Sequence, residues 1–451
     1  MESQTQGITD ATKLGKPKFL ILGIQHLFAM FGATVLVPLI TGLDVSTTLL
    51  FAGIGTLLFH LVSKMQVPAF LGSSFAFLGG YASVKQMGVE QGLTEEMALN
   101  YACIGVAAAT ALYFVMAFLL KMFGTEKVMK FFPPVVTGPM VIAIGLTLSG
   151  SAITNCSQNW LLAVVAIVIV ICTSIWGRGI VKIVPILLGV LGSYILAVVM
   201  GEVDFSSLSE VAWVGLPVHT DRTVVAVMQD PNYQMIITAI IGIFPIAFAT
   251  IMEHIGDMCA IQSTVGKNFI KNPGLHRTLS GDGLATLLAS LFGAPANTTY
   301  GENTGVLNIT KVFDPAVIRL AACFAILLSF CPKFACLIGL MPAATIGGVS
   351  LILYGMISAV GVRNLVESSV DFSSSRNVFV AALILVISIG VQYGTRGGVE
   401  IGPITISGLA LAAVVGIFLN AVLPSKLGMK IKSYQGKAKS DEKFHEMLNE
   451  E

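Results

Sequence analysis

The stretch Gly293 to Gly305, GAPANTTYGENTG, places a run of Gly, Asn, Thr and Glu within an otherwise apolar region of the chain. A second stretch, Pro68 to Gly80 with the sequence PAFLGSSFAFLGG, interrupts another apolar region with Gly and Ser. Polar, non-helical backbone at bilayer depth is tolerated only when it is buried in protein or lines a cavity. The two stretches therefore predict a membrane protein with a polar site near its centre.

The composition around these stretches excludes most other classes of protein. Of 451 residues, 55% are hydrophobic and 11% are charged, against roughly 25% charged residues in an average soluble domain. An ordinary cytosolic enzyme and a disordered chain are both excluded. The net charge is +1, so no basic field exists to attract nucleic acid. The seven cysteines have neither metal-ligand nor paired spacing, so we expect no metal site and no disulfide framework.

Apolar runs long enough to cross a bilayer recur along the chain, and we count fourteen between residues 18 and 424. Short cytoplasmic loops collect Lys and Arg. Placing both termini in the cytoplasm puts all but four of the 26 Lys and Arg residues on the inner side. The alternative is an even number of spans other than fourteen. One span missed or wrongly added in the middle of the chain would move many of these Lys and Arg residues to the outer side.

The long acidic segment 202–234 divides the predicted spans into seven and seven, which is typical of transporters built from inverted repeats. Residues 132–146 of the fifth span resemble residues 341–355 of the twelfth. The interrupted spans, the third and the tenth, are also seven apart. The similarity between residues 132–146 and 341–355 has an alternative explanation, because Gly, Ala and Pro are common in all membrane helices. Paired interruptions at corresponding repeat positions point to a transporter's binding site.

Four ionisable residues within or beside predicted spans stand out as candidates for a functional site. Glu253 and Asp257, in IMEHIGD, are four residues apart and share one helix face. Glu302 lies in YGENTG, and His26 lies in the first span. A membrane-embedded carboxylate marks a substrate or proton pathway by default. The alternatives are a charge at a helix end for Asp257 and a packed, hydrogen-bonded histidine for His26. No Walker loop or nucleophile elbow is present, which argues against an ATP-driven pump and a membrane hydrolase.

Five motifs carry a resemblance that covers about residues 18 to 424. They are QHLFAMFGATVLVP (25–38), PAFLGSSFAF (68–77), EHIGD (253–257), NPGLHR (272–277) and NTTYGENTGVLNITK (297–311). Through them the chain resembles the nucleobase–cation symporters of the nucleobase–ascorbate transporter family and, within it, the bacterial uracil permeases.

The resemblance implies an all-α polytopic membrane protein of fourteen spans in two inverted seven-span repeats, with short strands in spans three and ten. It also implies a core domain and a gate domain, and a homodimer formed through the gate. On this sequence the expected parts are a cytoplasmic N-terminus (1–17), the core (18–122 and 235–333), the gate (129–201 and 341–424), an outer loop (202–234) and a cytoplasmic tail (425–451).

The function that the resemblance implies is proton-coupled import of uracil across the plasma membrane by alternating access. Such a protein is not an enzyme and needs no cofactor, because a proton gradient drives it. Uracil offers two N–H donors and two C=O acceptors, which carboxylates and backbone amides can complement. The implied substrate-binding residues are Phe75, Glu253, Tyr300, Gly301, Glu302 and Tyr354, and the implied proton-coupling residues are Glu253, Asp257 and His26.

One residue departs from the uracil-permease pattern. Those permeases carry His four residues after the site glutamate, whereas this chain carries Asp257, as purine-transporting relatives often do. Purine members usually begin the signature with Gln, whereas this chain has Glu302. The alternatives therefore remain another pyrimidine, or a purine such as xanthine or uric acid. An anion transporter of the related sulfate-permease fold is a further alternative, against which both glutamates count.

Overall fold

The computed structural model describes residues 7–129, 133–182, 184–395, 398–401 and 404–424. The predicted tail, 425–451, and the first six residues of the predicted N-terminus lie outside this part of the chain. The first half is helical apart from one short strand. Its elements are η1 (Ala11–Leu14), α1 (Lys16–Thr41), α2 (Val45–Val62), β1 (Leu71–Ser73), α3 (Leu78–Glu90), α4 (Glu95–Phe123), α5 (Thr125–Met129), α6 (Pro134–Cys156), α7 (Trp160–Trp176), η2 (Gly179–Lys182) and α8 (Pro185–Val199).

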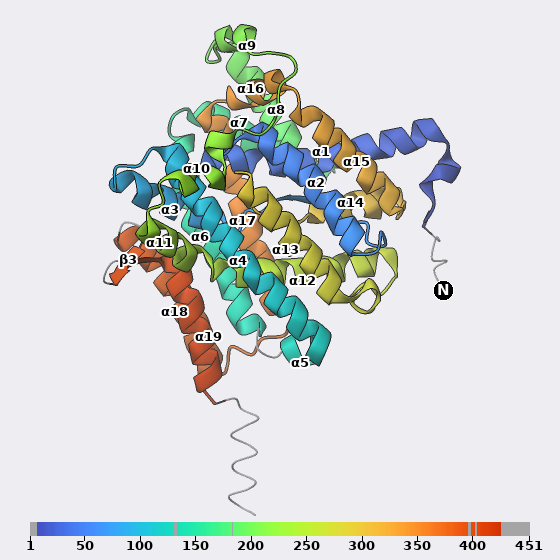
Figure 1. The fold of residues 1–451 in the computed structure, drawn as a ribbon. Helices are drawn as coiled ribbons and strands as arrows, with labels where there is room; N and C mark the ends of the chain where they lie inside the picture. Colours follow the sequence, from blue (N-terminus) through green and yellow to red (C-terminus); the bar gives the residue numbers. More distant parts are fainter. Residues whose placement is uncertain (1–6, 130–132, 183, 396–397, 402–403, 425–451) are drawn as a thin grey trace, which may run out of the picture.

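The second half begins with the segment predicted as an outer loop, which carries three short helices. Its elements are α9 (Ser206–Glu210), η3 (Thr220–Arg222), α10 (Val224–Gln229), α11 (Tyr233–Ile243), α12 (Ile246–Val265), η4 (Ile270–Gly274), α13 (Leu275–Leu291), β2 (Asn297–Thr299), α14 (Gly301–Thr310), α15 (Pro315–Ser329), α16 (Pro332–Gly339), α17 (Ala343–Glu367), α18 (Ser375–Gly394), β3 (Gly398–Ile401), β4 (Ile404–Ser407) and α19 (Gly408–Val422). In Figure 1, α9 and α5 lie at opposite ends of the molecule.

Several helices are long and apolar enough to cross a bilayer. Among the described residues seven pass by length and composition, with α11 and α12 taken as one, and the bent pair α15–α16 would make eight. The helices α7, α8 and α19 are apolar but shorter. These helices make the chain a multi-pass membrane protein. The count of fourteen spans stays a prediction, because spans three and ten are divided into a strand and a short helix.

Capping residues in the sequence account for where several helices begin. Asp44 accepts a hydrogen bond from the backbone N–H of Thr47 at 2.7 Å, and Thr94 caps α4 in the same way. Such side chains satisfy N–H groups that have no partner within the helix. At the other end of α1, Gly42 adopts a left-handed conformation with φ of 92°. Glycine reaches this conformation without the steric cost of a side chain.

The predicted eighth span is interrupted at Phe244 and Pro245, between α11 and α12. Proline lacks the N–H group that would continue the helix. The predicted eighth span ended at residue 256, whereas α12 continues to Val265. Asp257 therefore lies well inside a helix, not at its end. The predicted fourteenth span began at residue 404, but residues 404–407 form strand β4, and the helix begins at Gly408.

The helices α6 and α17 pack closely against one another. A Cβ atom on Gly145 would lie 2.2 Å from the carbonyl oxygen of Tyr354, so only glycine allows this approach. The Ser358 hydroxyl donates to the Ile142 carbonyl at 3.1 Å, and the Asn364 amide donates to Thr137 at 3.1 Å. Residues 134–146 of α6 and 343–355 of α17 belong to the two stretches whose sequences resemble each other.

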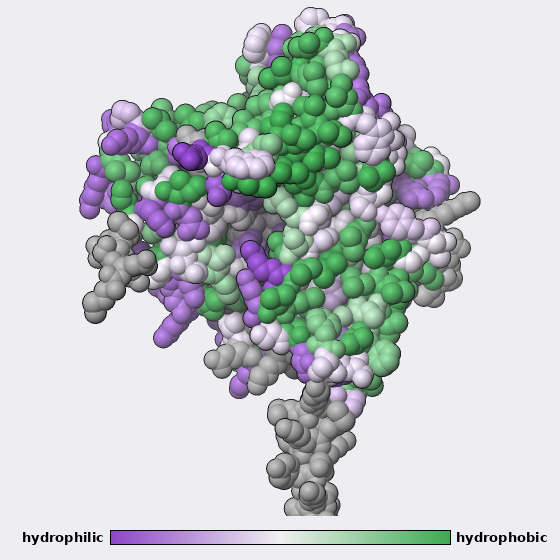
Figure 2. All heavy atoms as spheres, turned by 180° about the vertical axis from the view of Figure 1, so that it is seen from behind, coloured by the Kyte–Doolittle hydropathy of each residue, from purple (hydrophilic) through white to green (hydrophobic). Residues whose placement is uncertain are grey.

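The surface is apolar over a wide area. Figure 2 shows this area across much of one face, with polar side chains gathered in a hollow near its middle. Large hydrophobic side chains are exposed along the outer helices, where a soluble protein would carry charge. Examples are Trp160, Val164, Val168, Ile175, Phe379 and Val386.

Candidate functional site

Strands β1 and β2 form a two-stranded antiparallel sheet inside the helical bundle. Leu71 pairs with Thr299, Gly72 with Thr298, and Ser73 with Asn297. All six residues are buried. Each strand lies in one of the two stretches that interrupt the apolar sequence, and each is followed by a short helix, α3 or α14. The pairing brings residues more than 220 positions apart into contact.

Polar side chains from neighbouring helices satisfy the outer edges of this sheet. Thr56 of α2 accepts a hydrogen bond from the Leu71 N–H at 2.9 Å. Ser73 donates to the Thr34 carbonyl at 2.9 Å. Thr286 of α13 donates to the Asn297 carbonyl at 2.9 Å. Because water is scarce at bilayer depth, such partners are what make non-helical backbone stable there.

The helix α14 begins beside the sheet and presents its first residues to an accessible space. Gly301 is its first residue, so the Gly301 N–H has no acceptor within the helix. Glu302 follows and is partly exposed, while Gly301 itself is exposed. An N-terminal N–H group of this kind can donate to an acceptor oxygen of a ligand.

Glu253 and Asp257 of α12 face the same region as Glu302. The Thr299 hydroxyl donates to Asp257 Oδ2 at 2.7 Å, and a Cβ on Gly301 would lie 4.0 Å from Asp257 Oδ1. Glu253 is exposed although it lies inside the bundle, and Asp257 is partly exposed. Glu253 interacts electrostatically with both Asp257 and Glu302. Three carboxyl groups from two helices thus gather beside β2.

Two aromatic residues lie at the strand ends. Tyr300 is buried, and its hydroxyl donates to the Ser73 carbonyl at 2.9 Å and accepts from Thr34 at 3.3 Å. This hydrogen bonding fixes the tyrosine ring against β1. Phe75 is half-buried and packs against three separate hydrophobic clusters, so it lies where these clusters meet.

Tyr354 comes from α17 and is buried. Tyr354 and Ile144 of α6 belong to one hydrophobic cluster, and Phe75 packs against that cluster. Phe75, Glu253, Asp257, Tyr300, Gly301 and Glu302 therefore surround the strand pair and the start of α14. Tyr354 lies on α17, which packs against α6.

His26 is buried on α1 and contacts α14. The Asn303 side-chain nitrogen lies 3.1 Å from His26 Nδ1 and donates to the His26 carbonyl at 3.0 Å. These contacts link α1 to the residue after Glu302. A direct hydrogen bond from His26 to Glu253 or Asp257 is not among those found in the described part of the chain.

A buried pair behind Glu253 was not predicted. Asp282 of α13 and His254 of α12 are both fully buried, with Asp282 Oδ2 3.1 Å from His254 Nδ1. His254 Nε2 lies 3.1 Å from the Thr278 hydroxyl. Asp282 stands within a predicted span in the sequence GDG, so an ionisable residue in an apolar run was the available signal. Its contact with His254 could not be read from the sequence, because the two residues come from different helices.

The described residues contain no group of three or more His, Cys, Asp or Glu side chains placed to hold a metal ion. The arrangement instead offers hydrogen-bond acceptors from the carboxylates and a backbone donor from Gly301. Such a site can bind a flat polar molecule that has both donors and acceptors.

Comparisons with known proteins match nearly the whole chain. The model of a family described as the permease family matches residues 17–397. The uracil permease of Bacillus subtilis (strain 168) is 39% identical over 414 residues, covering 89% of this chain and 91% of that protein. The probable uracil permease of Haemophilus influenzae is 38% identical over 424 residues, covering 92% of this chain and 96% of that protein.

A solved structure has the same fold. The transmembrane domain of a cyanobacterium bicarbonate transporter, BicA, aligns with a TM-score of 0.58 and 15% identity, covering 93% of this chain and all of that chain. At this identity the likeness concerns the fold alone.

Proposed function

This chain belongs to the permease family whose model matches residues 17–397, and from that premise we propose that it imports uracil together with protons. The membership confirms the predicted resemblance and the predicted class, a transporter rather than an enzyme. Uracil as the substrate is supported by the relatives named uracil permease, which match nine-tenths of their own length.

The observation that carries this proposal is the meeting of carboxylates and a free backbone N–H beside the strand pair. Glu253 and Glu302 would accept the two N–H groups of uracil. The N–H groups of Gly301 and Phe75 would donate to its carbonyl oxygens. Phe75 and Tyr300 would flank the ring, and Tyr354 would approach from α17. A site built to complement every polar group of its ligand rejects molecules that leave one unpaired.

Proton coupling follows from the electrostatics of the carboxyl groups. Glu253 lies within interaction range of Asp257, Asp282 and Glu302. Several negative charges held together in a membrane repel one another, and binding a proton relieves that repulsion. We propose that Glu253 and Asp257 share the transported proton, and that His26 acts through Asn303 by orienting α14. The proton gradient would drive transport, so no cofactor would be needed.

Alternating access would move a core domain (18–122 and 235–333) against a gate domain (129–201 and 341–424), in a chain of fourteen spans and two inverted repeats. Support comes from packing that recurs between the halves. The packing of α4 of the first half on α13 of the second corresponds to the packing of α15 of the second half on α2 of the first. In the same way, the packing of α7 on α17 corresponds to that of α18 on α6. The antiparallel pairing of β1 with β2 has the same two-fold character.

We place the protein in the plasma membrane, with both termini cytoplasmic and with a homodimer formed through the gate. The distribution of Lys and Arg supports this orientation. The exposed apolar side chains of α7 and α18, such as Val168 and Val386, support an interface with lipid or with a second copy. Segment 202–234 would then face outward.

A purine is the second candidate substrate. Asp257 is partly exposed and close to Gly301, so it could contact a larger ring directly. An anion, which the fold neighbour's name suggests for that protein, fits poorly because Glu253 and Glu302 would repel it.

The test is uptake of radiolabelled uracil by proteoliposomes, with and without an inward proton gradient. We expect accumulation only with the gradient, and competition by unlabelled uracil but not by xanthine. Absence of uracil uptake together with gradient-driven uptake of labelled xanthine would assign the site to purines. Uptake that is equal with and without the gradient would overturn the coupling.

A further inference from the structure

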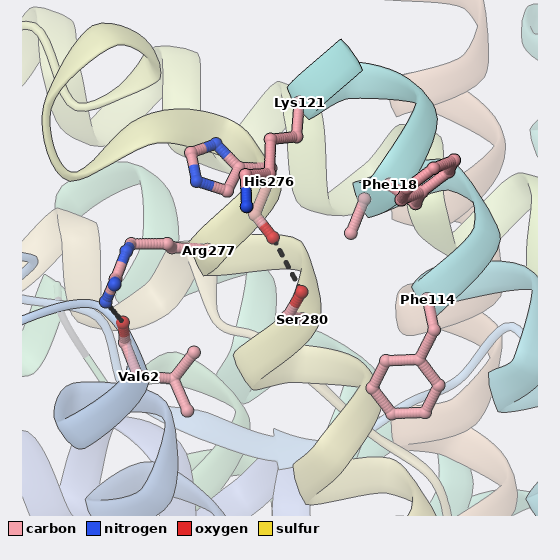
Figure 3. A pocket seen from close by; sticks show the side chains of 8 residues that line it. Val62, Phe114, Phe118, Lys121, His276, Arg277 and Ser280 are labelled. Atoms are coloured by element: carbon pink, nitrogen blue, oxygen red, sulfur yellow. Dashed lines mark hydrogen bonds between the residues drawn. The ribbon is translucent and has the colours of Figure 1, made fainter.

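A pocket of about 470 Å³ opens where the ends of α2, α4 and α13 meet, away from the carboxylate site (Figure 3). It is lined by Val62, Phe114, Ala117, Phe118, Lys121, His276, Arg277 and Ser280. Val62 is the last residue of α2, Lys121 lies in the last turn of α4, and Arg277 lies in the first turn of α13. The pocket is therefore at one end of the bundle, near the surface of the bilayer.

One wall of the pocket is basic. Figure 3 shows Lys121 of α4 lying above His276 of α13, with Arg277 beside them. One Arg277 nitrogen donates to the Val62 carbonyl at 2.9 Å, which fixes the guanidinium. A guanidinium has five N–H donors, so others remain for a ligand. Among side chains that the structure describes, no carboxylate lies within 4 Å of Lys121 or Arg277.

The positive charges of this wall affect the pKa of His276. Burial, and then the charges of Arg277, Lys121 and Lys64, lower the pKa of His276 below its usual range. The imidazole is therefore neutral at pH 7 and can serve as a hydrogen-bonding group. An anion bound here would offset the cations and raise the pKa of His276 again.

The other wall is apolar and continues onto the outside of the molecule. Phe114 and Phe118 line the pocket and are 37% and 61% exposed. On the same helix Val115 and Met122 are 53% and 62% exposed. An exposed apolar face on a membrane-spanning helix contacts acyl chains. An inorganic phosphate ion has no apolar part that could contact this wall.

We propose that this pocket binds the phosphate-bearing headgroup of an anionic phospholipid, with an acyl chain along α4. Basic pockets between transmembrane helices on the cytoplasmic side are suited to such headgroups. Other lysines of the same end, Lys64, Lys267 and Lys271, flank the helices that form the pocket. The bound lipid joins α2, α4 and α13 at the inner leaflet and stabilises their packing.

The experiment measures lipid binding to the full chain, purified and delipidated in detergent, by native mass spectrometry. Phosphatidylglycerol and phosphatidylcholine of the same acyl chains are compared, with inorganic phosphate as a separate arm. We expect tighter binding of phosphatidylglycerol and no effect of inorganic phosphate. Lys121→Gln should weaken phosphatidylglycerol binding about fivefold, the effect of one lysine near the membrane surface. Lys182→Gln is the control, because Lys182 is exposed at the end of η2 and does not line the pocket.

Three results would overturn the proposal. They are equal binding of the two lipids, equal losses in the Lys121 and Lys182 variants, and binding of inorganic phosphate that displaces the lipid. Lys121 is exposed, so its variant should fold normally. A second readout is the His276 imidazole by NMR, whose pKa should rise with phosphatidylglycerol and not with phosphatidylcholine. None of these measurements depends on uracil, so their outcome is independent of the proposed transport function.

Discussion

Glu302 is the second residue of α14 and is partly exposed beside Gly301. A carboxylate here can accept a hydrogen bond from a ligand whose carbonyl receives the Gly301 N–H. Asp257 is held differently, because its Oδ2 already accepts from Thr299 at 2.7 Å. The two acidic residues therefore differ in their contacts: Asp257 is bound to strand β2, and the proposed role of Glu302 is toward the substrate.

Replacing Glu302 by Gln should weaken uracil binding by about tenfold or more, because a mismatched buried polar pair costs about 1–3 kcal/mol. Calorimetry in detergent gives the affinity. Glu210→Gln is the matched control, since Glu210 is exposed on α9. Unchanged affinity in a folded Glu302→Gln protein would remove this residue from the site.

Replacing Asp257 by Asn should impair transport more than equilibrium binding, because the amide can still contact Thr299 but cannot share a proton. Uracil binding in detergent and uptake in vesicles are measured across pH on one preparation. Asp257→His should move the pH optimum of uptake, since imidazole titrates near neutral pH. Equal losses of binding and transport would place Asp257 in contact with the substrate and would strengthen the purine alternative.

At the scale of elements, the strand pair β1–β2 is stable only because helices supply its missing partners. Thr56 of α2 accepts from the Leu71 N–H and donates to the Leu71 carbonyl, at 2.9 and 3.1 Å. At the other strand, Thr286 of α13 donates to the Asn297 carbonyl at 2.9 Å, and the Asn297 side chain donates to the Phe51 carbonyl of α2 at 3.0 Å. The binding site is thus built on backbone that depends on α2 and α13.

Thr56→Val keeps the shape of the side chain but leaves the Leu71 N–H without its acceptor. An unsatisfied buried donor costs about 1–3 kcal/mol, so the temperature of half-unfolding in detergent should fall. The control is Thr154→Val on α6, where the exposed hydroxyl bonds only within its own helix, to the Gly150 carbonyl. If both variants unfold at the same temperature as the parent, Thr56 does not support the strand.

The interruptions in the third and tenth predicted spans were visible in the sequence, because Ser, Thr and Gly stand out in an apolar chain. The grouping of Glu253, Asp257 and Glu302 was expected from the family resemblance, and the structure brings them together. The contact between His254 and Asp282 was not predictable, because no local pattern links α12 to α13. Strand β4 was missed because Ile404 and Ile406 lead directly into the apolar residues of α19, so the sequence predicts a helical span from residue 404.

At the scale of the whole molecule, both halves of the chain contribute to the site. The strand β1 and Phe75 come from the first half, and β2, Glu302 and Glu253 come from the second. All of them lie in the proposed core domain, so a movement of the proposed gate domain against it would change access to the carboxylates. Proton binding at Glu253 would link that movement to the gradient.

The central claim is that the carboxylate cluster couples proton entry to uracil entry. The most direct measurement compares the parent and Glu253→Gln in proteoliposomes, using one batch of vesicles for gradient-driven accumulation of labelled uracil and for exchange of labelled against unlabelled uracil without a gradient. We expect the parent to accumulate uracil above the external concentration, and the variant to lose accumulation while any remaining flux does not respond to the gradient. Accumulation by Glu253→Gln at the parent level on the imposed gradient would contradict the account.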